Sequence, residues 1–201
     1  MYIKRLRPEQ IERLVDFRKS REYTKALQVI VHREFLKQKK ELIKNFSKHP
    51  VTVEIEGGIG ASNLSNTLNG RGNLFSFIGF NSSEKPLFPI YEKLESIELT
   101  STIIKKDGRS TSVILFPTAE DIFSVTPMPW ADGLSWAEGI EKGIPNLGQY
   151  LFKETDKSRS GRGIQSKSQV SGASFSPTPY IGSMIKKFEN TIKNLNQLTV
   201  T

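Results

Sequence analysis

Apolar side chains recur at steps of three and four residues along the N-terminal quarter of the chain. The stretch 9–46 contains neither Gly nor Pro, and Pro8 suits the start of a helix. This spacing predicts one long helix, or two in succession, that packs one face on the core. The periodic positions are Leu27, Ile30, Val31, Phe35, Leu42 and Phe46. The pair His49-Pro50 then ends the helical region, because a residue before proline is pushed toward extended geometry.

A period of two follows, which is typical of half-buried strands. Val51, Val53 and Ile55 alternate with polar residues and predict a strand. We expect two further strands, at 74–80 and at 122–125, and a short helix at 89–97. These short elements would supply most of a small core.

The clearest local signal is a β-hairpin. Residues 100–105 and 111–116 are rich in β-branched side chains, and they flank the sequence Lys106-Asp107-Gly108-Arg109. Asp-Gly is a favoured pair for a type I′ turn. The pattern therefore predicts two antiparallel strands joined by a tight turn.

Helical spacing returns at the end of the chain, at Tyr180, Met184, Ile185, Phe188, Ile192 and Leu195. Before it, residues 153–178 are mainly Ser, Gly, Lys, Arg and Gln, which cannot form a core of their own. We therefore predict an α+β fold, in which a long N-terminal helix and a C-terminal helix pack on a small antiparallel sheet. Its expected parts are an N-terminal arm or helix (1–24), an α+β core (25–152), an extended loop (153–178) and a C-terminal helix that completes the core (179–201).

Charge is segregated along the 201 residues, whose formal net charge is +8. Residues 1–50 hold 14 Lys/Arg and 6 Asp/Glu, residues 51–150 hold 7 and 12, and residues 151–201 hold 8 and 3. Basic ends and an acidic middle can neutralise each other between neighbouring subunits, or place the basic parts along nucleic acid. The absence of cysteine excludes disulfides and thiolate metal sites. Without an apolar leader or a bilayer-length apolar run, we expect a soluble, unprocessed protein with no membrane partner.

No catalytic constellation is evident in the sequence. His32 and His49 are the only histidines, and neither lies in a metal-ligand pattern. The acidic pairs Glu138/Glu141 and Glu120/Asp121 lack a nearby base or nucleophile, which favours solvated acids or salt-bridge partners. The Gly/Asn-rich stretch 57–73 lacks the Gly-Lys-Ser/Thr ending of a phosphate-binding loop. We therefore expect a protein that is not an enzyme, with no catalytic, cofactor-binding or metal-binding residues.

Three short motifs, taken in order, resemble the tail-completion and neck (head–tail connector) proteins of long-tailed bacteriophages. The chain has Gly72-Asn73-Leu74 at the start of the predicted strand, then the hairpin, and then an aromatic-Ala-x-x-Ile-Glu-x-Gly segment at 136–143. Pro179-Tyr180-Ile181 opens the last helix. The resemblance covers roughly residues 25–195.

This resemblance implies a virion structural protein, assembled in the host cytoplasm as a homo-oligomeric ring of about 6 or 12 subunits. Such a ring joins the portal or connector to the tail tube or terminator protein and encloses the DNA path. Candidate contacts with lumenal DNA or with the next ring are Arg159, Arg162 and Lys167. Aromatic anchors, in the core or at a subunit junction, are Trp130, Trp136, Phe152 and Tyr180, with the core favoured. The alternatives are a basic nucleic-acid-binding protein, or another tail subunit such as a terminator or baseplate protein.

Overall fold

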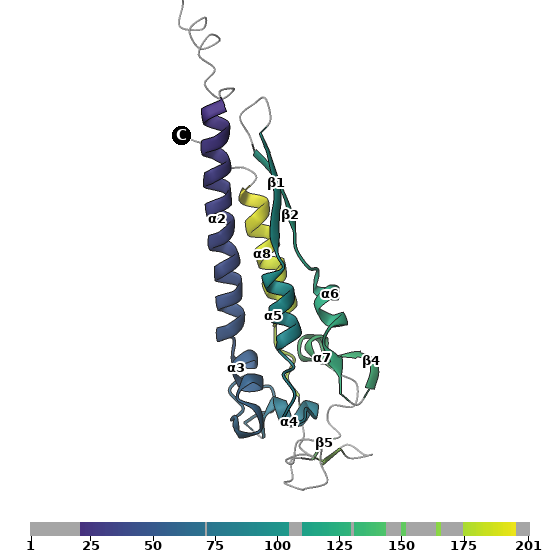
Figure 1. Cartoon of the computed structure of the whole chain (residues 1–201). Coiled ribbons are helices and arrows are strands. Elements are labelled where there is room, and N and C mark those ends of the chain that lie inside the picture. The colour runs from purple at the N-terminus through teal and green to yellow at the C-terminus, as the bar shows by residue number, and fades with distance from the viewer. Residues whose placement is uncertain are drawn as a thin grey trace, which may run out of the picture. The chain divides into compact units, whose positions relative to one another are not determined.

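The computed structural model describes residues 21–70, 72–104, 110–129, 131–143, 150–151, 164–165 and 175–195. In this part of the chain, strands form three separate two-stranded antiparallel sheets among helices (Figure 1). The fold is α+β, with a long N-terminal and a C-terminal helix, which confirms the predicted class. No helix within the described ranges is long and apolar enough to cross a membrane.

The chain divides into two compact units. We call the described residues of Met1–Gln38, Glu98–Leu115 and Asn190–Thr201 the hairpin unit. Those of Lys39–Ile97 and Phe116–Glu189 form the main unit. The helices α2 (Arg21–Lys48) and α8 (Ile181–Leu195) each contribute residues to both units.

The hairpin unit is built from the first part of α2 and two antiparallel strands, β1 (Glu98–Ile104) and β2 (Ser110–Leu115). The predicted hairpin is therefore confirmed, while its turn at 106–109 lies outside the described residues. Tyr23, Leu27 and Val31, one helical turn apart on α2, are buried together, and Leu99 of β1 packs against them. The amphipathic stripe of α2 thus covers the inner face of the hairpin.

The predicted strand at 51–55 is wrong, because these residues lie in helix α3 (Pro50–Glu56). Pro50 occupies the first turn, where its missing N–H is not needed, and His49 Nδ1 accepts a hydrogen bond from Val51 N at 3.3 Å. Thr52 and Glu54 are fully buried, whereas Val53 is 39% exposed. The pair at 49–50 therefore ends one helix and immediately caps the next.

The predicted strands at 74–80 and 122–125 are also helical. In α4 (Leu74–Ile78) all five side chains are buried, so the run carries no periodicity that distinguishes a strand from a helix. Asn73 caps its start, and Gly79, at φ +90°, ends it in the left-handed conformation. In α6 (Ala119–Ser124) a capping box between Thr118 and Asp121 fixes the first turn.

The predicted helices at 89–97 and at the end of the chain are confirmed as α5 (Phe88–Glu95) and α8. The aromatic-Ala-x-x-Ile-Glu segment forms a further short helix, α7 (Trp136–Lys142). Lys39 Nζ donates to the backbone oxygens of Glu95 and Ile97, at 2.6 and 2.9 Å, and so places a cation at the C-terminal end of α5. The remaining elements are a 3₁₀ turn at Gly58–Gly60 and the short strands β3 (Pro127–Met128), β4 (Ala131–Ser135), β5 (Tyr150–Leu151) and β6 (Ile164–Gln165).

A chain of aromatic rings fills the core of the main unit. Tyr180 lies between Phe46 and Trp136, at centroid distances of 5.9 and 6.4 Å, and Trp136 meets Phe80 edge-on at 5.7 Å. Trp136 and Tyr180 are 1% and 0% exposed. Aromatic contacts of this geometry stabilise a core beyond their buried area.

The start of α8 is held by a carboxylate from α7. Glu141 Oε1 accepts a hydrogen bond from Gly182 N at 2.5 Å. Burial raises the pKa of Glu141, although the backbone N–H groups of Gly182 and Tyr180 act in the opposite direction. A Cβ atom on Gly182 would lie 2.6 Å from Glu141 Oε2, so this close approach requires glycine.

We predict that Gly182→Ala lowers the free energy of unfolding by about 1 kcal/mol, because Glu141 must turn away and release its hydrogen bond. Urea denaturation measures this loss. In a Glu141→Ala background the same substitution should become neutral or stabilising, since alanine is the better helix former. Gly60→Ala, where a Cβ meets no atom within 4 Å, is the matched control. An equal loss in both backgrounds would show that the Glu141 contact is not the cause.

Candidate functional site

The main unit contains a fully buried carboxylate, that of Glu54, which is 0% exposed. Its Oε1 accepts from Asn63 Nδ2 at 2.9 Å and from Leu74 N at 2.7 Å. Its Oε2 accepts from the backbone N and the hydroxyl of Ser65, at 2.9 and 2.7 Å, and from Asn63 Nδ2 at 3.1 Å. Neutral donors thus satisfy both oxygens of a polar side chain that would otherwise be costly to bury.

Two asparagines extend this network through the Gly/Asn-rich loop. Asn63 Oδ1 accepts from the backbone N–H groups of Leu68 and Gly70, at 3.0 and 3.1 Å. Asn73 caps α4 through Ser76 N and donates to Ile59 O at 3.2 Å. The loop N–H groups thus bond to side chains of the same chain: those of Ser65 and Leu74 to the Glu54 carboxylate, and those of Leu68 and Gly70 to the Asn63 amide oxygen.

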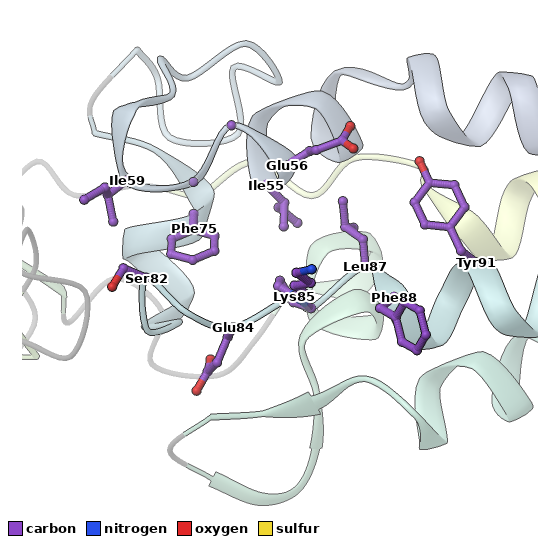
Figure 2. Close-up of a pocket in the computed structure, with 13 residues that line it drawn as sticks. Ile55, Glu56, Ile59, Phe75, Ser82, Glu84, Lys85, Leu87, Phe88 and Tyr91 are labelled. Carbon is purple, nitrogen blue, oxygen red and sulfur yellow. The ribbon is translucent and has the colours of Figure 1, made fainter.

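An open, mainly apolar pocket of about 580 Å³ lies directly beside this loop (Figure 2). Figure 2 shows the side chains of Ile55, Phe75 and Leu87 around its centre, with Ser82 at one end and Tyr91 at the other. The remaining lining residues are Glu56, Gly57, Gly58, Ile59, Glu84, Lys85, Pro86 and Phe88. Ile55 directly follows Glu54, and Phe75 directly follows Leu74, whose N–H donates to Glu54, so the Glu54 network fixes two walls of the pocket.

Charged groups lie at the rim of the pocket. Glu84 is engaged locally, because it accepts from Asn81 N and Asn81 Nδ2 at 3.1 and 2.9 Å. Glu56 is exposed, and within the described ranges it makes no hydrogen bond or ion pair. Burial raises the pKa of Tyr91, and the negative charge of Glu56 raises it further. The rim therefore presents the carboxylate of Glu56, which is available to a partner.

A second buried polar group joins distant parts of the main unit. The hydroxyls of Thr52 and Tyr180 lie 2.9 Å apart, and the His49 ring packs on Tyr180 at 5.1 Å. Burial raises the pKa of Tyr180 far above its usual range. Burial also lowers the pKa of His49, although a hydrogen bond to the Pro179 carbonyl opposes this. With Nδ1 accepting from Val51 N, His49 is held as a neutral imidazole whose two nitrogens are both used.

The acidic residues and histidines considered in the sequence have local roles. Asp121 completes the cap of α6, and hydrogen bonds from Thr118 lower its pKa. Glu138 pairs with Lys142 at 2.8 Å, and His32 is exposed on α2. In the described part of the chain, no group of three or more His, Asp or Glu residues could hold a metal ion.

The residues nominated as interface or DNA contacts divide into two groups. Trp136 and Tyr180 are buried in the main unit, so they organise its core and are not exposed anchors. Trp130, Arg159, Arg162 and Lys167 lie outside the described residues, as does Phe152. The nominated residues therefore do not form one described site.

Sequence reasoning missed the pocket and the Glu54 network. The sequence contained one signal for the network. The acidic Glu54 lies between two apolar residues, and the loop that follows is dense in Asn, Ser and Thr. Sequence reasoning also missed that the hairpin carries apolar side chains on its outer face. Ile103, Val113 and Leu115 lie there and are 59%, 49% and 68% exposed.

Comparison with known proteins gives no relative: no family model, no curated protein and no solved structure matches this chain.

We predict that Glu54→Gln lowers the free energy of unfolding by about 3 kcal/mol, because the new amide group turns a donor toward groups that need an acceptor. Glu56→Gln, two residues along the same helix but exposed, is the control and should change stability by less than about 0.5 kcal/mol. Urea denaturation followed by circular dichroism measures both variants. Similar small losses would mean that the buried network does not hold the loop.

We also predict that His49 makes the protein less stable as the pH falls below 6.5, the ordinary value of its pKa. The pKa is lowered in the folded state, so the unfolded chain takes up the proton first, and the stabilising contribution present above pH 6.5 is lost on acidification. His49→Asn keeps a capping oxygen but does not titrate, so its stability should fall less between pH 7.5 and 5.5. His32→Asn, which removes the other histidine, is the control. Identical pH profiles for wild type and His49→Asn would contradict the assignment.

Proposed function

We propose that the chain is a virion structural protein of a tailed phage, a subunit of a ring at the head–tail junction. The ring joins the portal or connector to the tail and encloses the DNA path. The motifs at 72–78, 136–143 and 179–181 suggest this role, and the surface of the hairpin unit is the observation that carries it.

The outer face of the hairpin is apolar and open. Ile103 on β1 and Val113 and Leu115 on β2 are all exposed, although Leu99 on the opposite face is covered by α2. A two-stranded hairpin that is apolar on both faces needs cover on both. A neighbouring subunit supplies that cover in a ring.

The free edge of β2 supports the same conclusion. In the described residues β2 pairs with β1 alone, and its sequence, Ser-Thr-Ser-Val-Ile-Leu, contains no charge, proline or glycine. Monomeric proteins usually protect such an edge with lysine, proline or a covering element. An unprotected edge fits a strand that pairs with, or lies against, another subunit.

A second candidate function, binding to nucleic acid, is favoured by the basic side of α2. Arg33, Lys37, Lys40 and Lys44 recur at helical spacing and are all exposed. Two of these lysines form weak ion pairs with acids on the same helix. Lys37 Nζ lies 3.4 Å from Glu34 Oε1, and Lys44 Nζ lies 3.8 Å from Glu41 Oε2. This stripe suits the phosphates of DNA, either as the main activity or along the path enclosed by a ring.

We predict that purified particles from the system that encodes this chain contain a low fixed number of copies, about 6 or 12, as expected for one cyclic ring. Quantitative mass spectrometry, scaled to the major shell protein, measures this number. Replacing Val113 and Leu115 with lysine should remove the protein from particles, because two buried charges would oppose subunit contact.

The matched control places two lysines at Ser96 and Ser124, which are exposed residues of the main unit, and should enter particles normally. Unfolding measurements on both double variants separate lost assembly from lost folding. Absence of the wild-type chain from particles would reject the virion role. Steeply salt-dependent binding of the free chain to duplex DNA would then favour the second candidate.

A further inference from the structure

We propose that the pocket of the main unit receives the N-terminal segment, residues 1–9, of a neighbouring copy of the chain. The proposal rests on the proposed function, because it names the contact that links one ring subunit to the next.

The pocket has the character of a peptide-binding site. Its centre is formed by Ile55, Phe75 and Leu87, and Phe88 stands beside this apolar surface with 58% of its side chain exposed. An exposed aromatic next to an apolar hollow is typical of the few residues that dominate the affinity of an interface. The volume of about 580 Å³ lies within the range of sites that bury most of a small ligand, and it has room for more than one side chain.

Residues 1–9, Met-Tyr-Ile-Lys-Arg-Leu-Arg-Pro-Glu, match this surface in composition. Tyr2, Ile3 and Leu6 supply aromatic and aliphatic anchors. They are interleaved with the cations of Lys4, Arg5 and Arg7. Short segments of this type bind by inserting apolar side chains while their charges meet the rim.

The charges of the two surfaces are complementary. Glu56 and Glu84 line the pocket together with Lys85, and the segment carries three cations and Glu9. Because Glu84 is already bonded to Asn81, Glu56 is the carboxylate available to the incoming cations. Lys85 is available to the single acid of the segment.

A segment and a pocket on the same chain form two different, complementary surfaces. Repeated from copy to copy, such a contact is head-to-tail, which is the type of contact that closes into a ring. A two-fold dimer would instead use one surface twice. The proposed contact is therefore head-to-tail, as the proposed ring requires.

Disulfide trapping tests the contact in the full-length chain, which contains no cysteine of its own. One copy carries a tag and Gln10→Cys, just beyond the segment, and an untagged copy carries Ser82→Cys at the pocket rim (Figure 2). Mild oxidation of the mixture should give a tagged–untagged dimer. A copy with Ser124→Cys, exposed on the main unit away from the pocket lining, is the control and should give about tenfold less dimer.

A charge swap tests specificity. Glu56→Lys in the Ser82→Cys copy should lower the yield of dimer about tenfold, because it places like charges together. Lys4→Glu and Arg5→Glu in the tagged copy should restore the yield. Circular dichroism confirms that each variant is folded.

Equal trapping at Ser82 and Ser124, or no effect of the charge swap, would overturn the proposal. So would an internal disulfide in one copy that carries both Gln10→Cys and Ser82→Cys, since the segment would then occupy its own pocket. Particle copy number reports separately on the proposed function. If particles contain the expected copy number but no disulfide-trapped dimer forms, only the pocket contact is rejected. If the dimer forms but the chain is absent from particles, only the ring role is rejected.

Discussion

The main unit depends on the burial of one carboxylate. Removing Glu54 from water is costly unless its oxygens find donors, and three residues from two segments supply them: Asn63 and Ser65 from the loop, and Leu74 from the start of α4. The loop must therefore fold back on α3 before the carboxylate is satisfied. This requirement explains why residues 57–73 are rich in Asn, Ser and Gly, which donate hydrogen bonds or adopt positive φ, as Asn66, Asn69 and Gly70 do.

A second group of contacts ties the end of the chain into the same unit. Tyr180 shares a hydrogen bond with Thr52 and lies against the rings of Phe46, His49 and Trp136. Ser176 N donates to Thr67 O, and Thr178 N donates to Ile140 O, both at 2.9 Å. Residues 176–180 therefore connect the Glu54 loop, α7 and α3. The pocket is built on a scaffold held at both of these points, so its walls are fixed before any partner arrives.

Long periodic elements were predictable from the sequence, and short buried ones were not. The stripe of α2, the β-branched runs of the hairpin and the spacing in α8 each extend over enough residues to distinguish periods of 3.6 and 2. At 51–55 the pattern misled, because Thr52 and Glu54 are buried polar residues whose partners are distant in sequence. At 74–78 every position is buried, so only the caps at Asn73 and Gly79 specify a helix. The pocket arises from the meeting of α3, α4 and the start of α5, which no local pattern encodes.

The uncharged edge of β2 has a consequence for how the protein must be produced. Ser110–Leu115 has the features of a segment prone to cross-β aggregation, namely high β-propensity, no charge and no proline. Among the described residues β2 pairs with β1 alone, so each collision between free copies offers its open edge an alternative strand partner. The fraction of the chain that stays unaggregated therefore depends on its concentration, so low expression levels and dilution protect the strand.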